Sequence, residues 1–270
     1  MRFPRWPLPV YSIEVRKLLS YRADFWIQFS GALAGNIIIS FALWKSIFLT
    51  SNQMTIGGYT FETMMLYYVI AALVDKCIRG NEMGNLSPDI YDGTFTRYLV
   101  YPLSSIGYKY MNHLAVSTMG IIQFFVGFAV CLLFIKIPHD SHMGLASLAM
   151  GFITIVFSGA LYFILNCCLE LVSFWADNVW SLLVILRLSA SILGGSWIPL
   201  TLFPPWAQHL IHYSPFPYLA SFPIRVFLGE IDGQLWIQGL ISTLLWCMGG
   251  FVVSQIIMKK GLLKYTGVGI

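Results

Sequence analysis

The sequence predicts an all-α membrane protein with six transmembrane helices, an N-terminal interfacial helix, and outer re-entrant or interfacial half-helices between the fifth and sixth spans. Hydrophobic residues make up 57% of the 270-residue chain and charged residues only 10%. Charge is nearly absent from several long runs, and a bilayer core about 30 Å thick takes about 20 apolar residues in a helix. Because such runs use most of residues 1–270, we expect one transmembrane domain and no separate soluble one.

Residues 1–24 are predicted to be a cytoplasmic amphipathic segment. Apolar residues recur at helical spacing in the stretch from Val10 to Tyr21, while Glu14, Arg16 and Lys17 point elsewhere. This pattern is typical of a helix lying in the membrane interface. We expect the segment to be retained, because it has no uninterrupted apolar core of the signal-peptide kind.

Six spans follow from the apolar runs. They are expected at residues 25–49, 61–78, 109–135, 143–168, 179–201 and 235–258. The third and sixth contain almost no charge, whereas the second has Glu62 at one end and Asp75, Lys76 and Arg79 at the other. Asp75 and Arg79 are four residues apart and can pair on one helical face.

The distribution of lysine and arginine orients these spans. With both termini inside, twelve of the sixteen basic residues face the cytoplasm, three face outward, and Arg187 lies within a span. Such a bias favours cytoplasmic N- and C-termini. It also explains the net charge of +4 without nucleic acid as a partner.

A proline-rich stretch separates the fifth and sixth spans. Residues 199–223 contain six of the twelve prolines, yet they remain apolar and aromatic. Non-helical backbone at the depth of the membrane needs surrounding protein or a water-filled cavity to satisfy the hydrogen bonds of its polar groups. We therefore expect residues 202–234 to form an outer re-entrant or interfacial segment; the alternative is an ordinary external loop.

No catalytic or metal-binding motif is evident. The sequence lacks the common hydrolase, metalloprotease, redox and nucleotide-binding signatures, and its five cysteines lack metal-site spacing. His139 and His142, and likewise His209 and His212, have no obvious third ligand and are interpreted as interfacial polar residues. We expect no catalytic residue, no metal and no cofactor on this chain.

Arg187 has two interpretations. A charge within a span is costly and normally faces protein or water, which makes it a partner for a substrate group or for an acid such as Glu170. Alternatively, its long side chain extends to the inner headgroups.

Residues 79–108 are expected to form the main cytoplasmic loop. We expect one short helix around residues 81–86 and another from Pro88 to Tyr91, which Gly93 ends. The following "TFTRYLVYP" can run along the membrane until Pro102. A compact loop with exposed acids is suited to docking on another protein.

Three stretches resemble a known family. "DIYDGTFTRYLVYPLSS", "WIPLTLFPPW" followed by "SPFPYLASFPIRVFLGE", and the tail "KKGLLKYTGVG" are similar to the permease subunits of small bacterial six-span type-2 ATP-binding-cassette (ABC) exporters. The resemblance covers nearly the whole chain. It departs at Val100 and Tyr101, where family members often have leucine and arginine before the proline.

The resemblance implies a bacterial inner-membrane permease that pairs with a second permease, identical or a sister, above a cytoplasmic ATPase dimer. ATP and Mg would bind that ATPase and not this chain. The implied coupling residues are Glu82, Asp89, Ile90, Tyr91, Asp92, Gly93, Thr94 and Arg97. The implied pathway residues are Tyr67, Tyr68, Arg187 and Ser191.

Export of a substrate from the cytoplasm or inner leaflet is therefore the expected function. An ion-gradient-driven secondary transporter is an alternative, although it would normally show more buried acids. An intramembrane lipid-modifying enzyme is another, but Glu62 is predicted outside and Asp75 inside, so no catalytic set converges.

Overall fold

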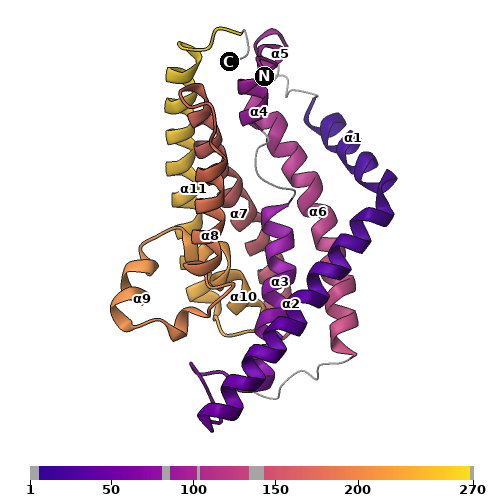
Figure 1. The fold of residues 1–270 in the computed structure, drawn as a ribbon, viewed down its shortest axis with the longest axis vertical. Coiled ribbons are helices and arrows are strands. Elements are labelled where there is room, and N and C mark those ends of the chain that lie inside the picture. The colour runs from indigo at the N-terminus through magenta and orange to yellow at the C-terminus, as the bar shows by residue number, and fades with distance from the viewer. Residues whose placement is uncertain (1–5, 81–85, 102–103, 134–142, 268–270) are drawn as a thin grey trace.

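A computed structural model describes residues 6–80, 86–101, 104–133 and 143–267. In these parts of the chain every regular element is a helix, and the longest helices run side by side along the long axis (Figure 1). The helical membrane-protein class predicted from the sequence is confirmed at this level.

Four helices are long and apolar enough to cross a membrane within the described residues. They are α2 (Arg22–Ser51), α6 (Ser105–Leu132), α7 (Leu145–Glu170) with its 3-10 extension η1 (Leu171–Phe174), and α11 (Gly233–Leu262). They coincide with the first, third, fourth and sixth predicted spans, which lack charge over their central turns.

α3 (Phe61–Arg79) corresponds to the second predicted span and lies at the centre of the main core. The Thr60 side chain caps its first turn by accepting a hydrogen bond from the Thr63 N–H, at 3.3 Å. Its last turn lies beside α6, with Gly80 next to His113 and Val116. These residues are about eight to eleven positions past the start of α6, or roughly 12 to 17 Å along its axis. The charged end of α3 is therefore recessed within the bundle.

α8 (Trp180–Ile192) is shorter than the predicted fifth span, so the predicted extent of 179–201 is wrong. The chain turns at Gly195, whose φ of +92° is a backbone conformation that L side chains rarely adopt. The Ser221 N–H donates to the Gly194 carbonyl at 2.7 Å and fixes the turn against the next helices. Hydropathy did not reveal this stop because residues on both sides of it are apolar.

Short helices follow, as predicted for the proline-rich stretch: η2 (Leu200–Leu202), α9 (Pro205–His212), η3 (Phe216–Leu219) and α10 (Ser221–Phe227). α10 packs against α3 and α7, with Ile224, Val226 and Phe227 fully buried. α10 is thus part of the core, whereas most residues of α9 are exposed.

The opposite end of the bundle carries three further helices. α1 (Pro7–Ser20) confirms the predicted N-terminal helix and packs along α6, while α4 (Ser87–Tyr91) and α5 (Thr96–Val100) lie near the ends of α7 and α11 (Figure 1). The first described residues and the last ones lie at this same end, since Trp6 approaches Gly107 and Tyr265 contacts Thr96.

Candidate functional site

Residues 86–100 rest on a second hydrophobic core, separate from the main one. Leu86, Ile90 and Phe95 are at most 2% exposed and pack against η1 and α11. The Phe95 ring lies edge-on to Phe174 and to Tyr265, with centroids 5.6 Å apart in both pairs. Since full burial of such side chains contributes about 1.5 to 3 kcal/mol each, this segment is fastened firmly to the bundle.

Polar contacts join the same segment to the ends of two spans. The Glu170 side chain, at the end of α7, accepts hydrogen bonds from the Leu86 N–H and the Asn166 amide. Beyond α11, the Tyr265 hydroxyl donates to the Gly93 carbonyl at 2.6 Å and accepts from the Thr96 N–H at 3.1 Å. Residues 86–100 are therefore attached both to the end of α7 and to the chain just beyond α11.

Asp89 is the centre of a charge cluster that holds α4, α5 and α6 together. Its carboxylate contacts Arg97 at 2.6 Å, Lys109 at 2.8 Å and the Tyr98 hydroxyl at 3.0 Å. Burial alone would raise the pKa of Asp89, but the hydrogen bond and charge of Lys109, with Tyr98 and Arg97, hold it below its usual range. Burial and the Asp89 charge raise the pKa of Tyr98 to about 12.

The structure sorts the predicted coupling residues into two groups. Asp89, Ile90 and Arg97 hold the segment together, and Gly93 permits its turn with a φ of +74°. The other group faces outward and consists of Tyr91, Asp92 and Thr94. Glu82 lies outside the described residues.

A shallow cavity of about 330 Å³ adjoins the outward-facing group. Tyr91 and Asp92 line one side of it, and Asp177 and Trp180 line the other. Sequence reasoning missed Asp177 and Trp180, because the fold alone brings the start of α8 beside α4. We call these four residues the docking surface.

Glu170→Ala is expected to lower the free energy of unfolding by about 1 to 3 kcal/mol, because the buried Leu86 N–H loses an acceptor. Thermal melting of the purified protein measures this effect. Asp177→Asn, at an exposed position, is the control and should melt as the unmodified protein does. Equal melting temperatures for Glu170→Ala and the control would contradict the fastening role of Glu170.

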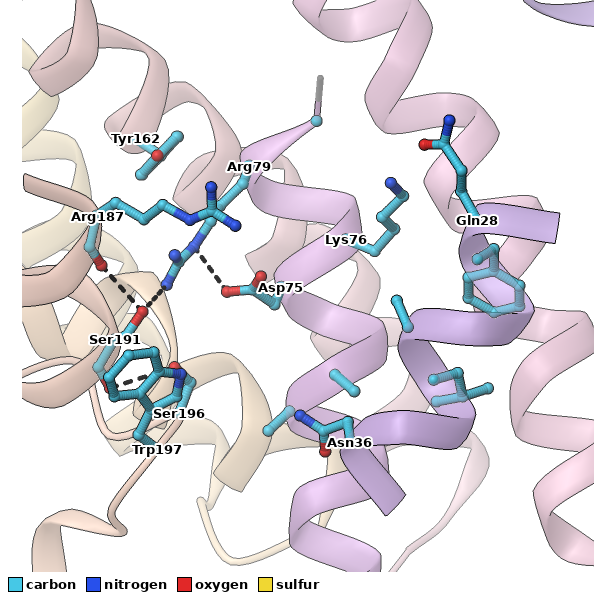
Figure 2. Close-up of a pocket in the computed structure, with 16 residues that line it drawn as sticks. Gln28, Asn36, Asp75, Lys76, Arg79, Tyr162, Arg187, Ser191, Ser196 and Trp197 are labelled. Atoms are coloured by element: carbon cyan, nitrogen blue, oxygen red, sulfur yellow. Dashed lines mark hydrogen bonds and ion pairs between the residues drawn. The ribbon is translucent and has the colours of Figure 1, made fainter. Parts of the chain in front are cut away.

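A second cavity, of about 370 Å³, lies between α2, α3, α7 and α8 (Figure 2). The predicted pairing of Asp75 with Arg79 is confirmed at 2.6 Å. Arg79 also donates to the Ser191 hydroxyl at 2.8 Å and lies over the Tyr162 ring, 5.8 Å from its centroid. The charged end of α3 and the polar face of α8 thus meet at this cavity.

Two of the four predicted pathway residues, Arg187 and Ser191, line this cavity. No ion pair joins Arg187 to Glu170 in the described part of the chain, so the suggested pairing is wrong; Glu170 faces Leu86 instead. Tyr67 and Tyr68 are buried, and their hydroxyls donate to the carbonyls of Gly195 and Trp197 at 2.6 Å each. They hold the turn after α8 and lie outside the cavity lining.

The histidine pairs form no metal site in the described residues. His209 and His212 lie on α9, and no group of three or more potential ligands occurs among the residues that the structure places. His139 and His142 lie outside the described ranges.

Comparison with known families agrees with this architecture. Residues 34–269 match the model of the ABC-2 family transporter proteins. The chain belongs to the ABC-2 transporter family. The ABC-2 match includes the C-terminal part of α2, the other three long apolar helices, the segment with the docking surface and the proline-rich helices. It confirms the resemblance to a type-2 ABC permease. A search among curated proteins finds no significant match.

Proposed function

We propose that this chain is the permease subunit of an ABC exporter, driven by a separate cytoplasmic ATPase dimer that binds ATP and Mg. The observation that carries this proposal is the attachment of residues 86–100 to the ends of α7 and α11 through Glu170 and Tyr265. Such a segment can transmit a push from a partner protein to helices that cross the membrane.

The proposal includes six crossings, with α3 and α8 as the two short ones. The neighbours of α3 shield its polar groups, since it is enclosed by α2, α6, α7 and α10. Residues 1–24 and 79–108 then face the cytoplasm, and residues 202–234 form the outer re-entrant segment. In a bacterial cell this topology places residues 1–270 in the inner membrane as one permease domain.

In the proposed mechanism the ATPase contacts the docking surface. Closure of the ATPase dimer would displace α4, and the displacement would pass through Glu170 to α7 and through Tyr265 to α11. Two permeases, identical or sister chains, would then switch a shared pathway from inward-facing to outward-facing. The cavity beside Arg79 and Arg187 is the polar part of that pathway.

Co-purification tests the proposal. The permease should co-purify in detergent with the ABC ATPase encoded beside it, and Asp92→Lys should reduce the recovered ATPase by about tenfold, as expected when a charged interface contact becomes repulsive. Glu62→Lys reverses an exposed charge at the opposite end of α3 and is the matched control. Failure with every neighbouring ATPase, together with transport driven by an ion gradient alone, would favour a secondary transporter instead.

A further inference from the structure

The cavity between α2, α3, α7 and α8 has an excess of positive charge. Three basic side chains line it, from Lys76, Arg79 and Arg187, whereas Asp75 is the single acidic residue in its lining. Figure 2 shows Asp75 and Arg79 on α3 facing Arg187 and Ser191 on α8.

The two arginines differ in how their charge is balanced. Arg79 is paired with Asp75, but no carboxylate of the described residues lies within 4.0 Å of the Arg187 guanidinium. Arg187 is also about seven residues into α8, or roughly 10 Å from its first residue. A cation at such a depth normally has an anionic partner or water around it.

Ser191 positions these groups relative to one another. Its hydroxyl donates to the Arg187 carbonyl at 2.9 Å and accepts from Arg79 at 2.8 Å. This contact holds the Arg79 side chain against α8, on the wall that also carries Arg187 (Figure 2). Guanidinium groups present planar donor pairs that match the oxygens of phosphates and carboxylates.

The opposite wall of the cavity carries an apolar patch. Phe29 and Leu33 of α2 and Ala71 of α3 form this patch, between the polar side chains of Gln28 and Asn36. On the α2 side, away from the arginines, the Asn36 side-chain oxygen is buried and has no hydrogen-bond partner in the described part of the chain (Figure 2). A buried acceptor of this kind needs a donor, which a bound molecule or water supplies.

We propose that this cavity binds an amphipathic anion, with its phosphate or carboxylate between Arg79 and Arg187 and its apolar part against Phe29 and Leu33. A donor group of the molecule, such as a hydroxyl or amide, would reach Asn36. We take this anion to be the exported substrate, and this step rests on the proposed transport function. The same chemistry is offered by an anionic phospholipid of the inner leaflet and by a free amphiphile.

Binding to the purified permease tests the site directly. In neutral maltoside detergent, dodecyl phosphate should raise the melting temperature in a saturable manner, whereas dodecyltrimethylammonium should not. Arg187→Gln should weaken the apparent affinity for dodecyl phosphate by about tenfold, the effect of losing one charge-assisted contact. Lys45→Gln removes an exposed cation elsewhere, at the far end of α2, and should leave the affinity unchanged.

Two results would overturn the proposal: equal affinity of Arg187→Gln and the unmodified protein for dodecyl phosphate, or equal binding of the anionic and cationic probes. Arg187→Lys keeps the charge but loses the planar donor pair, so it should retain part of the affinity. If Arg187→Gln does not fold, Arg187→Lys takes its place, and its affinity for both probes is measured. The site would be overturned if Arg187→Lys kept the full affinity for dodecyl phosphate and the two probes bound equally well.

Nanodiscs distinguish the two sources of the anion. If phosphatidylglycerol in the nanodisc competes with dodecyl phosphate, the site exists and a membrane lipid occupies it. If dodecyl phosphate binds saturably and phosphatidylglycerol does not compete, the site exists and a free amphiphile occupies it. These measurements contain no ATPase. If the unmodified permease did not bind dodecyl phosphate, the anion site alone would be contradicted. If the permease did not co-purify with an ATPase, the proposed function alone would be contradicted.

Discussion

Gly120→Leu is expected to lower the melting temperature of the purified protein by roughly 6 to 12 °C, because it forces α3 away from α6. A Cβ at Gly120 would lie 3.0 Å from the Cys77 Cα and 3.1 Å from the Lys76 carbonyl oxygen. Both neighbours are backbone atoms, so no side-chain rotation can make room. Overpacking of this kind costs about 3 kcal/mol at the upper end of the usual range.

The displaced helix also carries Asp75 and Arg79, so Gly120→Leu should disturb the charged cavity as well. Gly249→Leu is the matched control, since a Cβ at Gly249 in α11 meets nothing within 4 Å. Small residues at helix crossings allow close approach of the backbones in membrane proteins. If both variants melted at the same temperature, the close approach of α3 to α6 would be wrong.

Asp89→Ala is expected to destabilise residues 86–100 by about 2 kcal/mol and to lower permease-stimulated ATP hydrolysis by about tenfold. The substitution removes the common partner of Arg97, Tyr98 and Lys109. Without it, α4 and α5 lose their ionic attachment to α6, and in the proposed mechanism the loosened segment would transmit a push on α4 less effectively. Hydrolysis by the reconstituted complex and thermal melting of the permease measure the two effects.

Asp92→Asn provides the contrast. Asp92 is exposed on the docking surface, so its substitution should affect ATPase contact and leave the melting temperature unchanged. If Asp89→Ala weakened ATPase binding but left the melting temperature unchanged, the two aspartates would have the same role, and the distinction drawn between them would be wrong.

The pH dependence of the Asp89 cluster has a definite sign. The pKa of Asp89 is lowered in the folded protein, so its stabilising contribution is complete above the ordinary carboxyl value of about 4. The contribution is lost as the pH falls through the lowered folded value. The unmodified protein should therefore lose stability on acidification below about pH 4 to a greater extent than Asp89→Ala does.

Much of the helical architecture could be predicted because it depends on local patterns. Long apolar runs predicted α2, α6, α7 and α11, and the Pro88 and Gly93 positions predicted the bounds of α4. The end of α8 could not be predicted, because Gly195 turns the chain between two apolar stretches. The residues that donate hydrogen bonds to this turn, Tyr67 to the Gly195 carbonyl and Ser221 to the Gly194 carbonyl, are distant in the sequence.

For the candidate site, residue type and spacing indicated which residues matter but not what each one does. Asp89 and Asp92 look equivalent in "DIYDG", yet Asp89 is held by Arg97 and Lys109 while Asp92 faces outward. Likewise, the sequence left open whether Arg187 faces a substrate group, an acid such as Glu170 or the headgroups, whereas the fold places it in the cavity with Arg79.

The sequence by itself determined that the chain is a helical membrane protein with a punctuated segment at residues 88–105, because hydropathy, proline and glycine act over a few turns of chain. Only the tertiary structure decided that this segment is joined to α7 through Glu170 and to α11 through Tyr265. It also decided that the charged end of α3 meets α8. Contacts between residues far apart in the chain depend on how helices pack, and packing is set by the shapes of many side chains together.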